Sequence, residues 1–135
     1  MIPHVIVIDD FLRNPDEVRQ RALGLTYQVG GRYPGLNSSE KITIEGLDQI
    51  VSHLVYEPVR APWTEDFSHG SCRASLASHN DKPARIHIDQ SHWSGILYLS
   101  RNEDSSGGTD FFRHLRTDTD RAPVFSDELA AKGYL

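Results

Sequence analysis

The sequence predicts a single globular domain of the α+β class in which β-strands dominate. The chain has 135 residues, of which 38% are hydrophobic and 24% charged, and this length and composition suit one folded core. Two segments within residues 1–60 carry helix signals. From Ser71 onward, short segments alternate apolar and polar residues between Gly, Pro, Asn and Asp, as antiparallel strands do. A helix-flanked antiparallel β-region is therefore expected.

The N-terminal part, residues 1–60, is expected to hold one strand and two supporting helices. The apolar run within residues 1–8 predicts the strand. A helix is predicted from Pro15 to Leu23, because Asn14 suits the N-cap and proline suits the first helical position. Gly24 supplies the stop signal for this helix.

A second helix is predicted before Pro58. Its apolar residues recur at helical spacing, which predicts a stripe that must lie on another apolar surface. Between the two helices, residues 33–35 predict a turn and residues 37–39 a continuing loop. The residues of the helical stripe are Leu47, Ile50, Val51, Leu54 and Val55.

The core strands are expected within residues 70–116. Alternation and β-branched residues predict four of them, which leaves residues 117–135 as a polar tail with a short helix starting at Ser126. The segment around residue 97 has apolar residues on both faces, as buried strands do. The four predicted strands lie at residues 71–77, 84–90, 94–100 and 109–115.

Charge and cysteine content exclude several classes of protein. The formal charge is −5, with 14 Lys and Arg against 19 Asp and Glu, so no global basic field attracts nucleic acid or anionic lipid. The single cysteine, Cys72, rules out an internal disulfide and suits a reducing, cytoplasmic compartment. The N-terminus has neither the basic leader of a signal peptide nor the length of a membrane span.

His87-Ile88-Asp89 is the most informative motif. Residues i and i+2 of a strand point to one face, so this imidazole and carboxylate are expected side by side. A histidine and a carboxylate are two of the three ligands in the facial triad of non-haem Fe(II) oxygenases. Chance alone gives about one such spacing in a chain with this His and acidic content. The second instance here, His79 to Asp81, lies among turn formers and is interpreted as a turn.

The context of this motif resembles a known family. After His87-Ile88-Asp89, residues 96–100 (Ile-Leu-Tyr-Leu-Ser) and then residues 107–111 (Gly-Gly-Thr-Asp-Phe) follow. This order resembles the prolyl-hydroxylase-like branch of the Fe(II)- and 2-oxoglutarate-dependent dioxygenases. Residues 7–16 and the turn at residues 33–35 are also similar to the N-terminal support region of such proteins.

The resemblance implies a partial double-stranded β-helix, a jelly-roll or cupin-like barrel with N-terminal supporting helices. It implies that His87 and Asp89 bind Fe(II), and that Tyr98 donates a hydrogen bond to 2-oxoglutarate. Alternatively, Tyr98 is a half-buried aromatic residue whose hydroxyl has found a local partner. The implied activity is hydroxylation of a small molecule or peptide, with Trp93 and residues 101–108 as candidate substrate contacts.

The sequence ends before two features of the family pattern. A second histidine ligand, and an Arg or Lys that pairs with 2-oxoglutarate, would follow further along, so the chain resembles a dioxygenase cut short within its barrel. Three alternatives supply the third ligand. His114 shares a predicted strand face with Asp110, His92 follows the motif closely, and a homodimer would complete the barrel in trans through its unpaired strand edges.

Two other functions remain open beside the oxygenase. A catalytically inactive or incomplete β-helix domain would serve as a binding or assembly module. A cupin-like metal-binding protein would bind a metal without responding to 2-oxoglutarate. Adding Fe(II) and then 2-oxoglutarate to the purified chain would distinguish these three functions.

Overall fold

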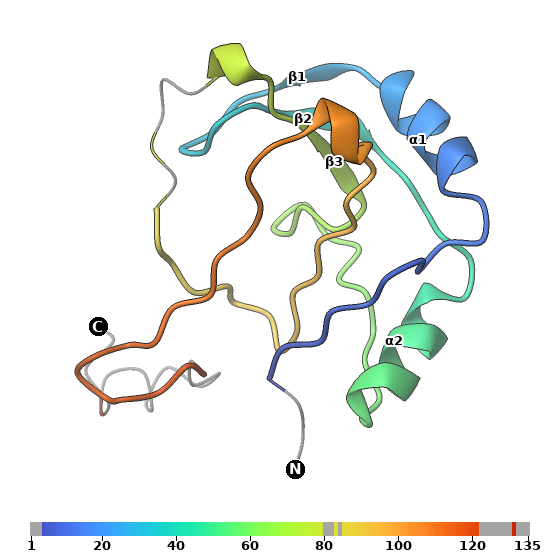
Figure 1. The fold of residues 1–135 in the computed structure, drawn as a ribbon. Helices are drawn as coiled ribbons and strands as arrows, with labels where there is room; N and C mark the ends of the chain where they lie inside the picture. Colours follow the sequence, from blue (N-terminus) through green and yellow to red (C-terminus); the bar gives the residue numbers. More distant parts are fainter. Residues whose placement is uncertain (1–3, 80–82, 84, 122–130, 132–135) are drawn as a thin grey trace. The chain divides into compact units, whose positions relative to one another are not determined.

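The structure is a computed structural model that describes residues 4–79, 83, 85–121 and 131. The chain forms two compact units, Met1–Arg85 and Ile86–Leu135, and each is described by itself. Within the described residues, two α-helices and a three-stranded antiparallel sheet make an α+β fold, and all five elements belong to the first unit (Figure 1). The α+β class is therefore confirmed, while the single domain stays a prediction.

Helix α1 (Pro15–Leu23) has the bounds that its sequence signals predict. The Asn14 side chain caps its N-terminus, accepting from the backbone N–H of Glu17 at 3.4 Å and donating to the Glu17 carboxylate at 3.0 Å. At the other end, the N–H of Gly24 bonds to two carbonyls of the last turn. Both ends are thus satisfied by residues close in sequence, which explains why local patterns locate this helix.

The sheet has the strand order β1-β2-β3, with β1 (Tyr27–Val29), β2 (Leu36–Lys41) and β3 (Ser71–Ala74). Both pairings are antiparallel, and each contains a shift in register. The central strand β2 brings together segments that lie more than thirty positions apart, since Asn37 pairs with Arg73. The predicted strand at residues 71–77 is confirmed over its first four residues.

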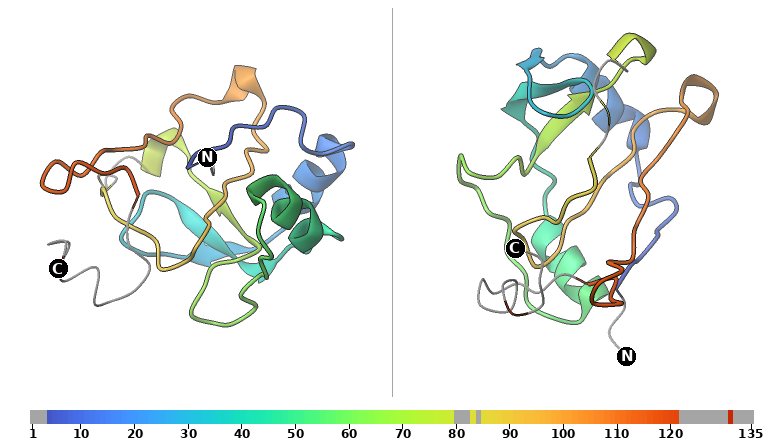
Figure 2. Two further views of the ribbon diagram at one scale, coloured as in Figure 1. Left: turned by 90° about the horizontal axis from the view of Figure 1, so that it is seen from below. Right: turned by 90° about the vertical axis from the view of Figure 1, so that its left-hand side faces the viewer.

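Helix α1 lies beside the sheet in Figures 1 and 2, and a hydrogen bond joins the two. The Tyr27 hydroxyl donates to the carbonyl of Ala22 in α1 at 2.7 Å, and Ala22 is only 7% exposed. Tyr27 pairs with Ser38, whose hydroxyl accepts from the backbone N–H of Cys72 at 2.9 Å. Burial raises the pKa values of the Tyr27 phenol and of the Cys72 thiol.

Helix α2 (Leu47–Val55) also forms over the predicted residues. The chain after it folds back along the helix, because the Ser52 hydroxyl accepts from the N–H of Val59 at 2.9 Å. The predicted apolar stripe is covered unevenly: Val55 is 4% exposed, whereas Ile50 is 46% exposed.

Two predictions for the first unit are wrong. Residues 4–10 form no strand, and Val7 in this run is 85% exposed, because no neighbouring strand pairs with the segment. Residues 37–39, predicted as a loop, lie inside β2. Their polarity misled the prediction, since Ser38 is 4% exposed with its hydroxyl satisfied by β3 and by the carbonyl of Glu40.

The predicted strands of the second unit are corrected as well. The described residues of 84–90, 94–100 and 109–115 lie in no strand ladder, although their sequences alternate as strands do. One isolated bridge joins His114 to Thr119 within the described part. A strand needs a neighbour for its backbone hydrogen bonds, and apart from this single bridge the segments pair with none of the described residues.

The predicted tail helix falls outside the described residues except for Ala131. Neither of the α-helices seen in the described part of the chain combines the length and the hydrophobicity of a membrane span.

Candidate metal site

His87 and Asp89 lie side by side near the start of the second unit. The Nε2 atom of His87 is 3.3 Å from Oδ1 of Asp89, and their side chains are 72% and 52% exposed. The predicted pairing of the two side chains is therefore confirmed, even though no strand ladder holds the segment. Their exposure leaves the pair accessible to an ion from solvent.

The separation of these two donor atoms fits joint coordination of one ion. Imidazole nitrogen and carboxylate oxygen bind divalent transition metals at about 2.1 Å. An ion at that distance from two donors 3.3 Å apart sees them at an angle of about 100°, between octahedral and tetrahedral values. His87 and Asp89 thus fit two adjacent positions of a metal centre.

The Tyr98 hydroxyl forms a hydrogen bond with the hydroxyl of Thr109. This bond spans the loop that contains Gly107, whose φ of +84° is the left-handed conformation that glycine adopts readily. The second and third segments of the sequence motif therefore meet in the structure. Tyr98 is nevertheless 61% exposed, so it is not a core residue.

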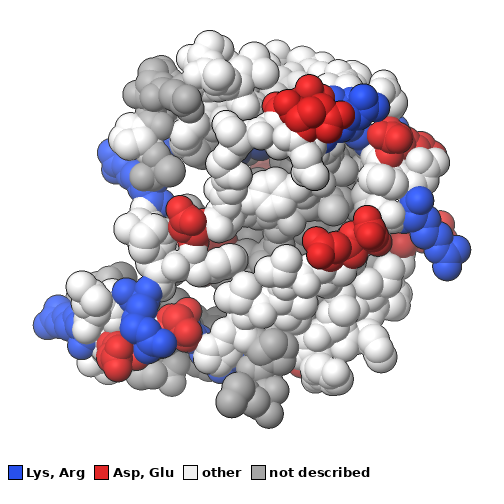
Figure 3. All heavy atoms as spheres, in the orientation of Figure 1, with Lys and Arg blue, Asp and Glu red and all other residues white. Residues whose placement is uncertain are grey.

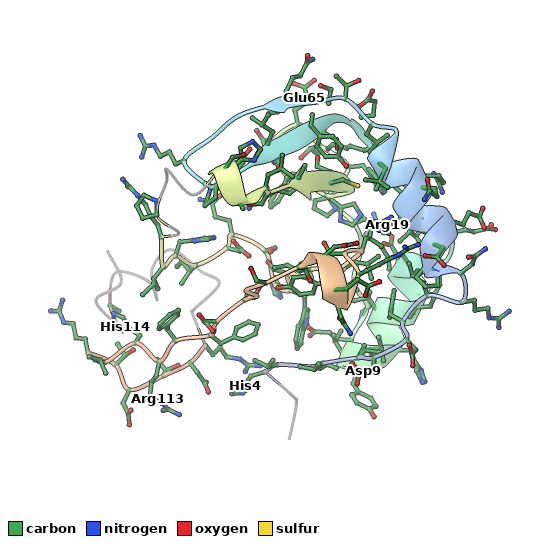
Figure 4. The ribbon with its side chains drawn as sticks, turned by 45° about the horizontal axis from the view of Figure 1, so that its top comes forward. His4, Asp9, Arg19, Glu65, Arg113 and His114 are labelled. Atoms are coloured by element: carbon green, nitrogen blue, oxygen red, sulfur yellow. The ribbon has the colours of Figure 1, made fainter. Side chains whose placement is uncertain are left out.

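His114 belongs to a short local turn at the end of the described part of the second unit, where Figure 4 labels it beside Arg113. Its Nδ1 atom lies 2.8 Å from the hydroxyl of Thr117, and its backbone N–H donates to the carbonyl of Thr119 at 2.7 Å. Arg113 closes the same turn through the carbonyl of Asp118 at 2.9 Å. The ring of His114 is thus oriented by its own turn.

Within the described residues, the structure assembles no group of three His, Cys, Asp or Glu side chains that would hold a metal ion. His87 and Asp89 come together, while His114 and the exposed His92 are not brought into a group with them. The third ligand therefore stays a prediction.

Two hydroxyl partners were missed by reasoning from the sequence. Thr109 bonds to Tyr98, and Thr117 bonds to His114. Thr109 follows directly after the Gly-Gly pair of the motif, so its position next to a turn was a usable signal. Thr117 lies three residues after His114, a spacing that local turns commonly bridge.

Charged side chains form small, separate groups on the face drawn in Figure 3. Among the described residues, Arg113 lies within 4 Å of two carboxylates, those of Asp118 and Asp120. The charge of Arg113 is therefore partly neutralised by neighbouring acids.

Comparisons with known proteins place the chain in a family. No curated protein and no solved structure matches it. A family profile, described as a family of unknown function (DUF6445), matches residues 2–131, which is nearly the whole chain. The chain therefore belongs to this family of unknown function.

Proposed function

We propose that this protein is an Fe(II)- and 2-oxoglutarate-dependent oxygenase that hydroxylates a small molecule or peptide. The observation that carries the proposal is the 3.3 Å approach of His87 Nε2 and Asp89 Oδ1. Support comes from the bond between Tyr98 and Thr109, which joins the later parts of the same motif. The three motif segments then occur in the order that the dioxygenase resemblance requires.

In this proposal His87 and Asp89 hold the metal, and His114 is the candidate third ligand. Bound Fe(II) would activate dioxygen as the oxidant, with one oxygen atom going to the substrate and the other to succinate as 2-oxoglutarate loses carbon dioxide. Histidine ligands commonly bond through their second ring nitrogen to an acceptor that fixes the ring. The contact between His114 Nδ1 and the Thr117 hydroxyl has this form, so His114 would coordinate through Nε2.

Tyr98 has the role of a hydrogen-bond donor to 2-oxoglutarate. A phenol can donate one hydrogen bond while accepting another. Thr109 can therefore donate to Tyr98 and orient its hydroxyl, leaving the Tyr98 proton for a ligand oxygen. The neighbouring loop, residues 101–108, and Trp93 are the proposed substrate contacts.

The jelly-roll is the proposed complete architecture, with a second copy of the chain supplying strand partners. Segments that alternate as strands expose large apolar side chains, a state that folded proteins normally avoid. Their exposed fractions reach 73% at Ile86, 64% at Ile96, 71% at Phe111 and 91% at Leu115. A cytoplasmic location is part of this proposal.

Anaerobic titration of the purified chain with Fe(II), and then with 2-oxoglutarate, tests the function. The proposal expects a metal-to-ligand charge-transfer absorption that appears on adding 2-oxoglutarate and is lost in His87→Ala. His53→Ala is the matched control, since it removes an exposed histidine from α2 and should keep the absorption. Metal binding with no response to 2-oxoglutarate would instead indicate a cupin-like protein, and no metal binding would indicate a binding module.

A further inference from the structure

The guanidinium of Arg73, on β3 of the first unit, is held in one orientation by two neighbours. Its Cζ atom lies 3.9 Å from the centre of the Tyr33 ring, within the range of a cation–π contact. Its Nε donates to Oδ1 of Asn37 at 2.9 Å. Asn37 is 8% exposed, so its side chain is fixed by burial and in turn fixes the arginine.

The sequence builds this arrangement through the strand register and one glycine. Asn37 and Arg73 are directly paired across β2 and β3, which places their side chains on the same face of the sheet. The Tyr33 ring reaches that face because Gly31 has no side chain, since a Cβ there would lie 2.7 Å from Cζ of the ring. The strand pairing and the small size of Gly31 therefore bring the three side chains together.

Among the residues that the structure describes, the remaining donors of this cluster have no acceptor. Arg73 keeps its two Nη groups, because its recorded contacts use only Nε and the ring face. Asn37 keeps its Nδ2 group, because its recorded side-chain bond uses Oδ1. Across the described residues, no carboxylate lies within salt-bridge distance of Arg73. An oriented cation with an adjacent amide donor is thus left without an anion.

We propose that Arg73, Asn37 and Tyr33 form a binding site for a carboxylate group. A carboxylate accepts two parallel bonds from the fork of an arginine, and a neighbouring amide can add a third. A carboxylate carries one negative charge, which the single arginine balances. A phosphate dianion would leave an excess charge in a chain whose net charge is already −5. The site lies wholly in the first unit and does not depend on the proposed oxygenase function.

The test is a titration of the metal-free, ¹⁵N-labelled chain followed by two-dimensional NMR. Arg73 Nε–H and Asn37 Nδ2–H₂ give their own side-chain signals, so the site is observed directly. The proposal expects sodium acetate to shift these signals saturably, while sodium chloride at equal ionic strength does not. Equal, unsaturable shifts with the two salts would overturn the site. Stronger binding of inorganic phosphate than of acetate would overturn the assignment to a carboxylate.

Variants separate binding from a purely structural role of the cluster. Arg73→Lys keeps the charge and removes the fork, so acetate affinity read at the Asn37 amide should fall at least about 5-fold. Arg60→Lys, on the segment after α2, is the control for loss of an arginine elsewhere. Wild-type affinity in Arg73→Lys, with unchanged backbone signals, would contradict the proposal.

Discussion

The His87 imidazole and the Asp89 carboxylate approach to 3.3 Å although neither residue belongs to a strand ladder. The two residues are separated by one position, so local backbone geometry is enough to place them together. Their approach therefore does not depend on the rest of a barrel. Within the described part of the chain, no third ligand joins them.

The bond between Tyr98 and Thr109 predicts an energetic coupling between the two residues. Tyr98→Phe and Thr109→Val each remove one partner. A hydrogen bond of this kind contributes about 0.5–1 kcal/mol, so a double-mutant cycle of urea unfolding should give a coupling of that size. Strict additivity of the two substitutions would show that the bond contributes nothing to stability.

The Asn14 cap predicts a local loss of stability when it is removed. Asn14→Ala abolishes the side-chain bond to the Glu17 N–H and should lower the free energy of unfolding by about 1 kcal/mol. Asn14→Asp keeps the acceptor and serves as the control. Urea denaturation followed by circular dichroism measures both, and equal stability of Asn14→Ala and wild type would refute the role of the cap.

The hydrogen bond to Glu40 should make the fold less stable at acid pH. The backbone N–H of Thr26 donates to the Glu40 carboxylate at 2.9 Å, and this bond lowers the pKa of Glu40 below its ordinary value of 4.5. Because the folded-state pKa is depressed, the stabilisation is present above pH 4.5 and is lost as pH falls through the lower, folded-state pKa. Between pH 7 and about pH 3, the free energy of unfolding in urea should vary less with pH in Glu40→Gln than in the wild type. An identical dependence in the two proteins would argue against the bond.

The Cys72 thiol should react slowly with disulfide reagents in the folded protein. Burial raises the pKa of its thiol, which lowers the fraction of reactive thiolate near neutral pH. Reaction with a disulfide reagent such as DTNB at pH 8 should be at least about 10-fold slower in the native chain than in the urea-unfolded chain. The unfolded chain is its own control, and similar rates in the two states would show that the thiol is unprotected.

The two α-helices could be predicted from the sequence because their signals are local. Asn14 and Gly24 mark the ends of α1 within one turn of the helix, and the apolar spacing marks α2. β2 could not be predicted in this way. Its polar residue Ser38 is buried through bonds to residues that include Cys72, 34 positions away, and such partners leave no trace in the local pattern.

The candidate site was predictable only in its local part. The spacing of His87 and Asp89 fixes their approach, and the Gly-Gly pair indicates the turn that leads to Thr109. Strand formation at residues 94–100 was predicted from apolar residues on both faces, a pattern that describes the side chains and says nothing of a partner. Pairing depends on a neighbouring backbone, so the apolar pattern alone is not sufficient for a strand there.

Anaerobic calorimetry of Fe(II) binding tests the central claim most directly, because it asks only whether His87 and Asp89 are metal ligands. Wild type and the control His53→Ala should bind Fe(II) with the same affinity. Removing a metal ligand should cost at least the loss of about 10- to 100-fold seen for residues that merely support ligands, so His87→Ala and Asp89→Ala should each weaken binding by that much or more. If both variants bind Fe(II) as tightly as His53→Ala, the pair is not a metal site and the oxygenase proposal fails.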